Sequence, residues 1–275
     1  MNAIHINWTA PFYEKNECEY YIEDFEILTT ILSALMWRKH NGKIKLVADK
    51  NAINFYKECK ILNIWDEVEE LKIDADISPA MFWAAGKIFA LKEQKAPIVL
   101  IDTDFIVWKK LNFNKISDCG VIHFEEINDN VYPPKSYFEM NEGYVWKDYD
   151  WQLKAANTAF CVFKNQELIN EYTHQAIEFM ENAKTSDDYL RYMVFCEQRL
   201  LPMCAKKNGY KINEISKQSD LFSNDNKAFT HIWGMKQQMR DNKELREHYC
   251  KKCINRILKE FPQMENVLNR IKNGC

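Results

Sequence analysis

The chain has 275 residues, of which 47% are hydrophobic, 13% aromatic and 28% charged, and its formal net charge is −3. This length and apolar fraction supply enough side chains for one large core or two small ones. Because the slightly acidic chain has no surplus of positive charge for a polyphosphate backbone, we exclude nucleic acid as a partner.

The sequence predicts a cytoplasmic protein. Residues 1–12 are too short and too mixed in character for a secretory signal, and no apolar run approaches the roughly 20 residues that span a bilayer. The nine cysteines are scattered and odd in number. That pattern is typical of reduced thiols rather than of a disulfide framework.

Strands and helices alternate through the first hundred residues. Apolar periodicity predicts strands at 3–8, 43–48, 67–73 and 97–102. It predicts the intervening helices at 24–40, 51–62 and 79–94. This alternation indicates an α/β domain with a central, mostly parallel sheet flanked by helices.

The middle of the chain is less regular. It contains predicted strands at 119–124 and 156–163 and predicted helices at 166–184 and 186–201. Residues 125–151 show no clear period, and so long an irregular stretch inside a compact domain is typical of a functional or mobile segment. Its aromatic side chains could stack on sugar rings, although packing against the domain is the commoner fate of each.

A helical tail is expected after about Asp241. Its apolar stripe has helical spacing and includes Cys250 and Cys253, which we interpret as core residues because no second Cys or His pair completes a zinc site. Lys and Arg outnumber Asp and Glu here, and a basic amphipathic tail can rest on anionic lipid at the inner face of the membrane. We therefore divide the chain into a catalytic domain, 1–236, and a tail packed on it, 237–275.

Two carboxylates stand at the end of the most apolar predicted strand. Asp102 and Asp104 interrupt the run 97–111, and buried carboxylates are costly unless paired or bound to metal. On extended backbone both would point to the same side and share a cation. Ligands of parallel sheets bind beyond the carboxyl ends of strands. We predict a divalent-metal site, with an ordinary loop as the alternative.

Further polar candidates occur singly along the chain. His231 could ligate metal, Gly234 would let backbone approach a ligand, and Lys236 suits phosphate. Lys87 follows a glycine within a predicted helix, and Asn157 begins a predicted strand. The alternatives are a structural histidine, a surface lysine and a turn asparagine.

The order of these motifs resembles the GT-A glycosyltransferases, most of all the retaining family-8 type that includes lipopolysaccharide galactosyltransferases and glycogenin. It is also similar to uncharacterised bacterial GT-A-like proteins. The resemblance implies a GT-A-like fold, a nucleotide-diphosphate sugar donor, usually a UDP-sugar, and Mn²⁺ (or Mg²⁺) as cofactor. It further implies a glycan or lipid-linked glycan as acceptor.

The resemblance also assigns residues. Asp102 and Asp104 match the family's DxD and, with His231, would hold the metal. Glu197 and Gln198 resemble the catalytic acidic-Gln pair beside the sugar. Donor binding would involve Thr9, Lys87, Asp102, Thr103, Asn157, Gly234 and Lys236.

Two other classes remain open. One is a nucleotidyltransferase on a similar sheet. The positions of the seven glycines argue against this class, because no two of them have the spacing of a glycine-rich phosphate-binding loop. The other is a catalytically inactive relative that binds a carbohydrate or a partner, although such a protein needs no metal-binding residues. Retaining and inverting outcomes are equally compatible with the sequence.

Overall fold

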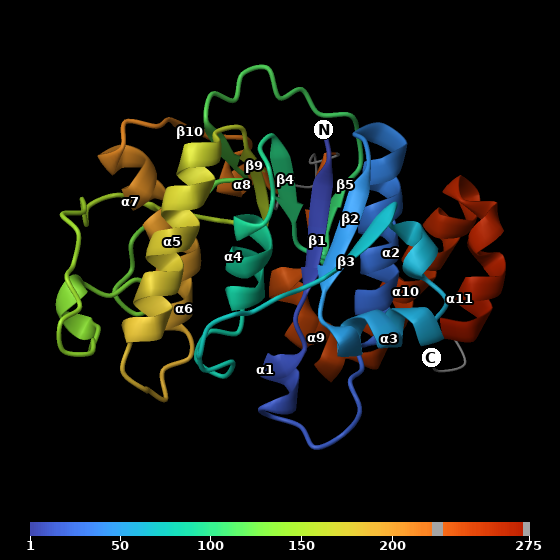
Figure 1. Cartoon of the computed structure of the whole chain (residues 1–275). Coiled ribbons are helices and arrows are strands. Elements are labelled where there is room, and N and C mark those ends of the chain that lie inside the picture. Colours follow the sequence, from blue (N-terminus) through green and yellow to red (C-terminus); the bar gives the residue numbers. More distant parts are fainter. Residues whose placement is uncertain (222–227, 272–275) are drawn as a thin grey trace.

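The structure, a computed structural model, describes residues 1–221 and 228–271. A seven-stranded sheet forms its centre, in the order β10, β6, β9, β4, β1, β2, β3 (Figure 1). Strand β9 runs antiparallel to β4 and β6, and the other neighbours are parallel. The strands are β1 Ala3–Asn7, β2 Ile44–Ala48, β3 Glu67–Glu70, β4 Ile98–Ile101, β6 Cys119–Val121, β9 Phe160–Phe163 and β10 Ile212–Glu214.

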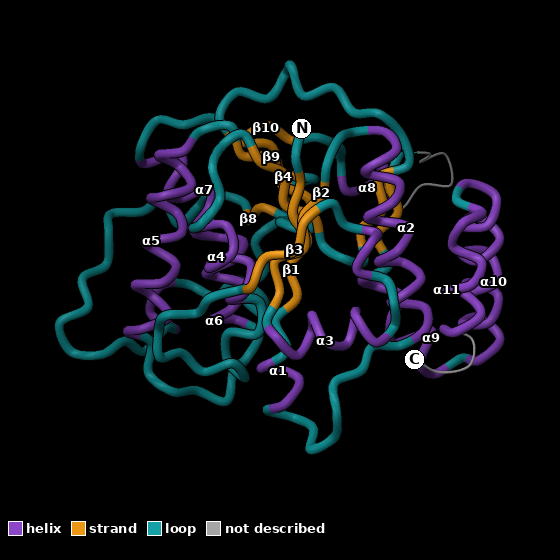
Figure 2. Tube along the Cα trace, turned by 45° about the vertical axis from the view of Figure 1, so that its right-hand side comes forward, coloured by secondary structure: helices purple, strands orange, loops and turns teal. Residues whose placement is uncertain are grey.

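Helices cover both faces of this sheet (Figure 2). Alternate strand residues point to opposite faces, so Leu46 and Val99 join one core cluster and Val47 and Leu100 the other. The first cluster is covered by α2 Asp24–His40, α3 Lys50–Glu58, α10 Lys243–Glu260 and α11 Glu265–Ile271. The second is covered by α4 Ala85–Lys92, α5 Gln166–Asn182, α6 Arg191–Val194 and α7 Leu200–Lys207.

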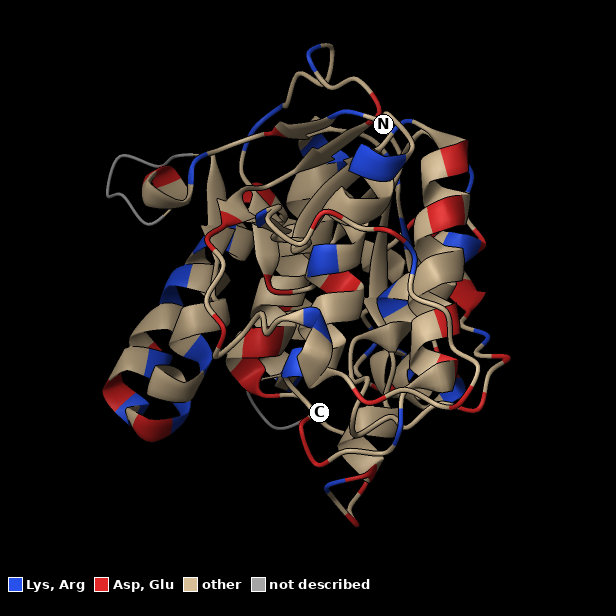
Figure 3. Cartoon of the chain, turned by 90° about the vertical axis from the view of Figure 1, so that its left-hand side faces the viewer, with Lys and Arg blue, Asp and Glu red and all other residues tan. Residues whose placement is uncertain are grey.

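The predicted fold class, an α/β domain with a mostly parallel central sheet flanked by helices and a helical C-terminal part, is confirmed. Cys250 and Cys253 are buried in the first cluster, as expected for core residues. Within the described residues, no helix combines the length and apolar character needed to cross a membrane. Positive and negative positions are interspersed on the face drawn in Figure 3.

Two predicted helices differ from the observed ones in their bounds. The helix expected from Pro79 begins only at Ala85, because residues 78–84 form hydrogen-bonded turns. The helix expected from Ser186 begins at Arg191, where Asp188 Oδ1 accepts from the backbone N–H groups of Leu190 and Arg191. It then continues to Lys207, six residues beyond the predicted end, with a π-helical turn at Phe195–Arg199.

Short elements complete the chain. Two small antiparallel pairs, β5–β11 and β7–β8, lie outside the main sheet. Their bounds are β5 Phe105–Val107, β7 Phe124–Glu125, β8 Ala155–Ala156 and β11 Phe229–His231. The remaining helical turns are α1 Ala10–Tyr13, η1 Leu62–Ile64, η2 Lys135–Tyr137, α8 Gln218–Leu221, η4 Trp233–Met235, α9 Lys236–Asp241 and η5 Pro262–Met264. The C-terminal part of the predicted tail, residues 272–275, lies outside the described residues.

The irregular segment 125–151 is held down by its own aromatic side chains. Phe138, Trp146 and Trp151 pack against Phe195, and the Trp151 and Phe195 rings stack with centroids 5.4 Å apart. Most of its aromatic rings therefore anchor the segment to the domain rather than face solvent.

Candidate functional site

The two aspartates lie in a tight turn between β4 and β5. The Asp102 N–H donates to the Ala159 carbonyl over 2.8 Å, and the Phe105 N–H closes the turn on the Asp102 carbonyl over 3.0 Å. The extended backbone expected at Asp102–Asp104 is therefore wrong. The carboxylates converge because the turn folds the chain back between them.

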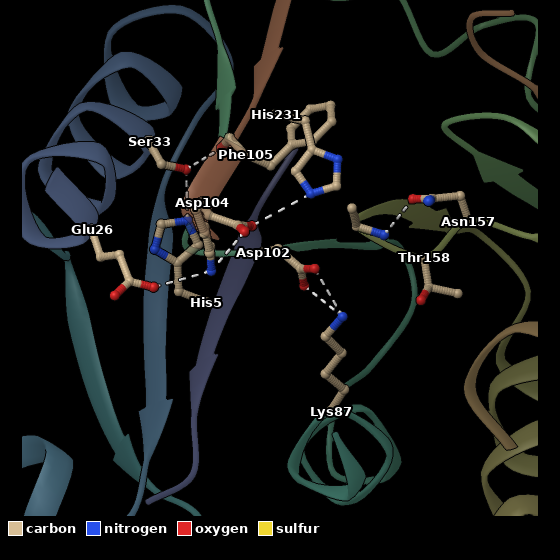
Figure 4. Close-up of polar contacts among 12 residues, drawn as sticks. His5, Glu26, Ser33, Lys87, Asp102, Asp104, Phe105, Asn157, Thr158 and His231 are labelled. Carbon is tan, nitrogen blue, oxygen red and sulfur yellow. Dashed lines mark hydrogen bonds and ion pairs between the residues drawn. The ribbon is translucent and has the colours of Figure 1, made fainter. Parts of the chain in front are cut away.

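Asp102, Asp104 and His231 form a group of prospective metal ligands (Figure 4). One ligand atom from each lies within 4.8 Å of the others. His231 ends β11, where it stands opposite Phe105 of β5. Its Nε2 is buried, lies 3.6 Å from Asp104 Oδ1 and has no hydrogen-bond partner among the described residues. Two carboxylates and an unpartnered imidazole nitrogen fit a divalent cation such as Mn²⁺ or Mg²⁺.

Lys236, the first residue of α9, pairs with Asp104. Its Nζ lies 2.9 Å from Asp104 Oδ2 and 3.2 Å from Glu26 Oε1. Burial opposes the charge on Asp104, but Lys236 and His231 outweigh it and hold the pKa of Asp104 well below its usual range. Burial also opposes the charge on Lys236, yet Asp104 and Glu26 raise its pKa. Both groups are therefore charged at neutral pH.

Lys87, on α4, joins Asp102 to Glu197. Its Nζ lies 2.7 Å from Asp102 Oδ1 and 2.5 Å from Glu197 Oε1. Burial raises the pKa of Asp102 to about 6, although Lys87 opposes the shift. Burial also acts against the charge on Lys87, but Asp102 and Glu197 outweigh it and raise the pKa of Lys87. Lys87 is therefore part of the site and not a surface lysine.

Glu197 and Gln198 occupy the π-helical turn Phe195–Arg199. Such turns are frequent at functional sites. The Glu197 Oε1 atom also accepts from the Thr158 hydroxyl over 2.8 Å. Arg199 donates to the Trp151 carbonyl over 2.7 Å, which ties the irregular segment to this turn.

A second polar network joins Asn157 to Gln198. Asn157 Nδ2 donates to Glu125 Oε1 over 2.7 Å, and the Tyr132 hydroxyl lies 2.7 Å from Glu125 Oε2 and 2.5 Å from Gln198 Oε1. A hydroxyl carries one proton, which Tyr132 donates in its hydrogen bond to the Glu125 carboxylate, an acceptor-only group. We therefore assign the Gln198 amide with its NH₂ group toward the Tyr132 oxygen.

A hollow of about 240 Å³ adjoins the metal-ligand group on the β1 side. Thr103, Asp104, Lys87 and Lys236 line one part of it. Its other part is largely aromatic and is lined by Trp8, Tyr20, Tyr56 and Trp83 together with Asn7. Asn7 Nδ2 donates to the Tyr56 hydroxyl over 2.7 Å and to the Tyr20 hydroxyl over 2.9 Å. A larger hollow, about 330 Å³, lies at the amino-terminal ends of β1, β2 and β4, opposite the strand ends that lead to Asp102 and Asp104, and both basic and acidic residues line it, among them Lys45 and Glu67.

Two predicted donor-binding residues lie apart from these contacts. Thr9 is buried, and both its N–H and its hydroxyl donate to Asp49 Oδ2, over 2.6 and 2.8 Å. Gly234 is exposed on the turn η4, where an added Cβ would meet no atom of the described residues within 4 Å. Their roles remain predictions.

Comparison with known proteins places the sequence in a family. The model of a family of unknown function, DUF6734, matches residues 1–271. The chain belongs to the DUF6734 family. No curated protein matches the sequence.

Solved structures similar to this DUF6734 protein share little sequence with it. The glycosyltransferase GlyE of Streptococcus pneumoniae is 11% identical with a TM-score of 0.39, and the match covers 81% of this chain and 46% of GlyE. The CTP:phosphocholine cytidylyltransferase LicC of Streptococcus pneumoniae is 12% identical, with a TM-score of 0.38 and coverage of 89% and 99%. HddC of Yersinia pseudotuberculosis is 12% identical, with a TM-score of 0.42 and coverage of 91% and 98%. At these scores none of the three assigns a function to the DUF6734 chain.

Several site residues of this DUF6734 protein were not predicted from its sequence. Glu26 sits in the first turn of α2, where an acidic residue is usual for helix stability alone. Glu125 and Tyr132 belong to the irregular segment and have no periodicity to mark them. Asn7 ends β1 next to the aromatic Trp8, and this polar residue at a strand's carboxyl end was the one available signal.

Proposed function

We propose that this protein is a metal-dependent glycosyltransferase. It would move a sugar from a nucleotide-diphosphate donor of the UDP-sugar kind to a glycan or lipid-linked glycan acceptor, with Mn²⁺ or Mg²⁺ bound by Asp102, Asp104 and His231. The observation that carries the proposal is the buried His231 Nε2, which has no hydrogen-bond partner within residues 1–221 and 228–271 and lies beside two converging carboxylates. An imidazole among the ligands favours Mn²⁺ over Mg²⁺.

The charges around this group suit a leaving diphosphate. A bound divalent ion would offset the negative charge that develops as the sugar–phosphate bond breaks. Lys236 lies 2.9 Å from Asp104 and would place a second positive charge beside the oxygens of the leaving diphosphate. The lining of the adjoining hollow by Asn7, Tyr20 and Tyr56 supports a planar nucleobase there.

Glu197, Gln198 and Asn157 would meet the transferred sugar. Glu197 pairs with Lys87, and a nearby carboxylate stabilises an oxocarbenium-like sugar. Gln198 and Asn157 are tied together through Tyr132 and Glu125, so their amides are held in place to recognise hydroxyl groups. Thr9, Thr103 and Gly234 complete the proposed donor site.

The acceptor and the compartment follow from the same proposal. The buried cysteines fit the reducing cytoplasm, where nucleotide sugars are used. A lipid-linked acceptor would be met at the inner face of the membrane, with the basic helical tail close to anionic lipid.

Thermal unfolding with UDP, GDP, CDP, ADP and dTDP, with and without Mn²⁺, tests the proposal. A ligand at a hundred times its dissociation constant stabilises the native state by about 2.7 kcal/mol. We expect a Mn²⁺-dependent shift with UDP that Asp104→Asn abolishes. Asp66→Asn is the matched control. Asp66 pairs with Arg38 at the amino-terminal ends of the central strands, away from the proposed metal site, so this variant should keep the wild-type shift.

The enzymatic readout separates the alternatives. Release of UDP from a UDP-sugar in the presence of Mn²⁺ would support the glycosyltransferase. Release of pyrophosphate from a nucleoside triphosphate would identify a nucleotidyltransferase instead. A protein that gives neither product and no metal-dependent shift would be an inactive binding relative.

A further inference from the structure

A chain of buried hydrogen bonds runs from β1 to the aspartate turn (Figure 4). Trp65 Nε1–H donates to His5 Nδ1 over 3.1 Å, and His5 Nε2 lies 3.0 Å from the Ser33 Oγ atom. Ser33 Oγ–H donates to the Phe105 carbonyl over 2.5 Å. Phe105 follows Asp104 directly, so this series of hydrogen bonds ends at the turn that carries the proposed metal ligands.

The direction of every hydrogen bond in this chain is fixed. Trp65 can only donate, so His5 Nδ1 must accept and the ring proton of neutral His5 lies on Nε2. His5 therefore donates to Ser33, whose own proton is left for the Phe105 carbonyl. His5, Ser33 and Phe105 are each at most 1% exposed, so water does not replace any of these partners.

The Phe105 carbonyl needs this partner because the β5–β11 pair cannot supply one. The Ile232 N–H donates to the Asp104 carbonyl over 3.3 Å, which makes Asp104 and Ile232 a hydrogen-bonded pair. In an antiparallel ladder the next pair, Phe105 opposite His231, is then not hydrogen-bonded, and its polar groups point away from the partner strand. The Phe105 N–H closes the aspartate turn, and its carbonyl turns inward to Ser33.

We propose that Ser33 and His5 are positioning residues for the metal site. Ser33 holds the end of the turn that carries Asp104, and His5 orients Ser33, so the pair fixes the distance between Asp104, Asp102 and His231. Neither side chain touches the ion. The inference rests on the proposed metal-dependent function. Residues that orient metal ligands from behind typically change metal affinity by about 10–100-fold when removed.

The test measures Mn²⁺ affinity of the full chain by titration with metal alone, followed by electron paramagnetic resonance of the free ion. We expect Ser33→Ala to weaken Mn²⁺ binding about tenfold or more. Thr29→Val is the matched control. Thr29 is a buried hydroxyl one turn earlier on α2 that bonds to the Phe25 carbonyl and Tyr249, away from the site. It should lower the melting temperature comparably and leave Mn²⁺ affinity unchanged.

The outcomes are distinct. Ser33→Ala with wild-type Mn²⁺ affinity, or an equal loss of affinity in Thr29→Val, would overturn the positioning role and leave the proposed function standing. A wild-type protein that binds no Mn²⁺ would overturn both. If Ser33→Ala does not fold, Ser33→Cys leaves no cavity, since its side chain is slightly larger, and it replaces the hydroxyl by a weaker donor; it carries the same expectation.

Discussion

Lys87 Nζ lies 2.5 Å from Glu197 Oε1, and the Glu197 side chain is only 3% exposed. The same ammonium group contacts Asp102 over 2.7 Å. One lysine therefore contacts both the proposed catalytic carboxylate and one proposed metal ligand, and its single positive charge is shared between them. The buried Glu197 carboxylate and the partly exposed Asp102 carboxylate, whose side chain is 22% exposed, both have this lysine as an ion-pair partner.

Lys87→Met should therefore unfold at a lower temperature than wild type. Removing one partner of a buried ion pair costs about 3–5 kcal/mol, and we expect roughly the lower value because Lys87 is 17% exposed. At about 2–4 °C per kcal/mol the melting temperature should fall by roughly 6–12 °C. Circular dichroism checks this. Lys92→Met on the same helix is the control, since Lys92 and Asp74 are 41% and 71% exposed and should matter little. Equal losses in both variants would contradict the prediction.

Tyr132→Phe should slow sugar transfer without weakening nucleotide binding. The change removes the hydroxyl that lies between Glu125 and Gln198, and misplacement of a positioning group by about 1 Å can cost about a hundredfold in rate. Turnover and Mn²⁺-dependent UDP binding are measured in parallel. Tyr137→Phe, on the same segment but bonded to Asp188 at the surface, should keep wild-type turnover. Loss of UDP binding in Tyr132→Phe would contradict the proposal that Tyr132 acts on the sugar-binding residues and not on the nucleotide-binding ones.

Gly86→Ala should weaken nucleotide binding, although alanine favours a helix by roughly 1 kcal/mol. A Cβ at position 86 would stand 2.8 Å from Trp8 Cβ, and overpacking of this kind costs about 1–3 kcal/mol. Displacement of Trp8 would narrow the aromatic hollow. Calorimetric titration with UDP and Mn²⁺ gives the affinity.

Gly234→Ala is the companion variant, because its Cβ meets no atom of the described residues within 4 Å. Its melting temperature should match that of wild type. A loss of nucleotide affinity at unchanged stability would support the predicted close approach of the Gly234 backbone to the donor. Unchanged affinity would remove Gly234 from the site.

The stability of the protein should fall with acid through His5. Burial lowers the pKa of His5 from 6.5 to about 3, so the unfolded chain binds a proton that the native state does not take up between these values. This contribution is fully present above pH 6.5 and decreases as the pH falls toward 3. It changes the unfolding free energy by at most about 1.4 kcal/mol per pH unit.

Urea unfolding at several pH values between 7 and 4 measures this slope. In His5→Gln the unfolding free energy should change less steeply with pH, by an amount that corresponds to at most one bound proton. In His174→Gln, whose side chain is 71% exposed, the dependence on pH should match that of wild type. Identical slopes in all three proteins would refute the assignment to His5.

Local patterns located the elements that are long and regular. Helix α2 was predicted at its observed bounds, Asp24–His40, because its apolar residues recur at helical spacing. Asp102 and Asp104 were found because charge in an apolar run is unusual. The three-residue strands β5 and β11 were missed, since they exist only through pairing between segments more than 100 residues apart.

The hydrogen-bonded chain under the site was missed for the same kind of reason. His5 is an isolated polar residue in a strand, and its partners Ser33 and Trp65 lie 28 and 60 residues away. No spacing in the sequence connects them. The fold alone brings them together behind the aspartate turn.

Strand β3, at one end of the sheet, has a further consequence. An edge strand offers its backbone to any other strand, including the same edge of a second molecule. Here the edge consists of Glu67, Val68, Glu69 and Glu70. When two such edges approach, carboxylates face carboxylates, which disfavours pairing. The acidic edge at β3 therefore disfavours the addition of a further strand on that side of the sheet.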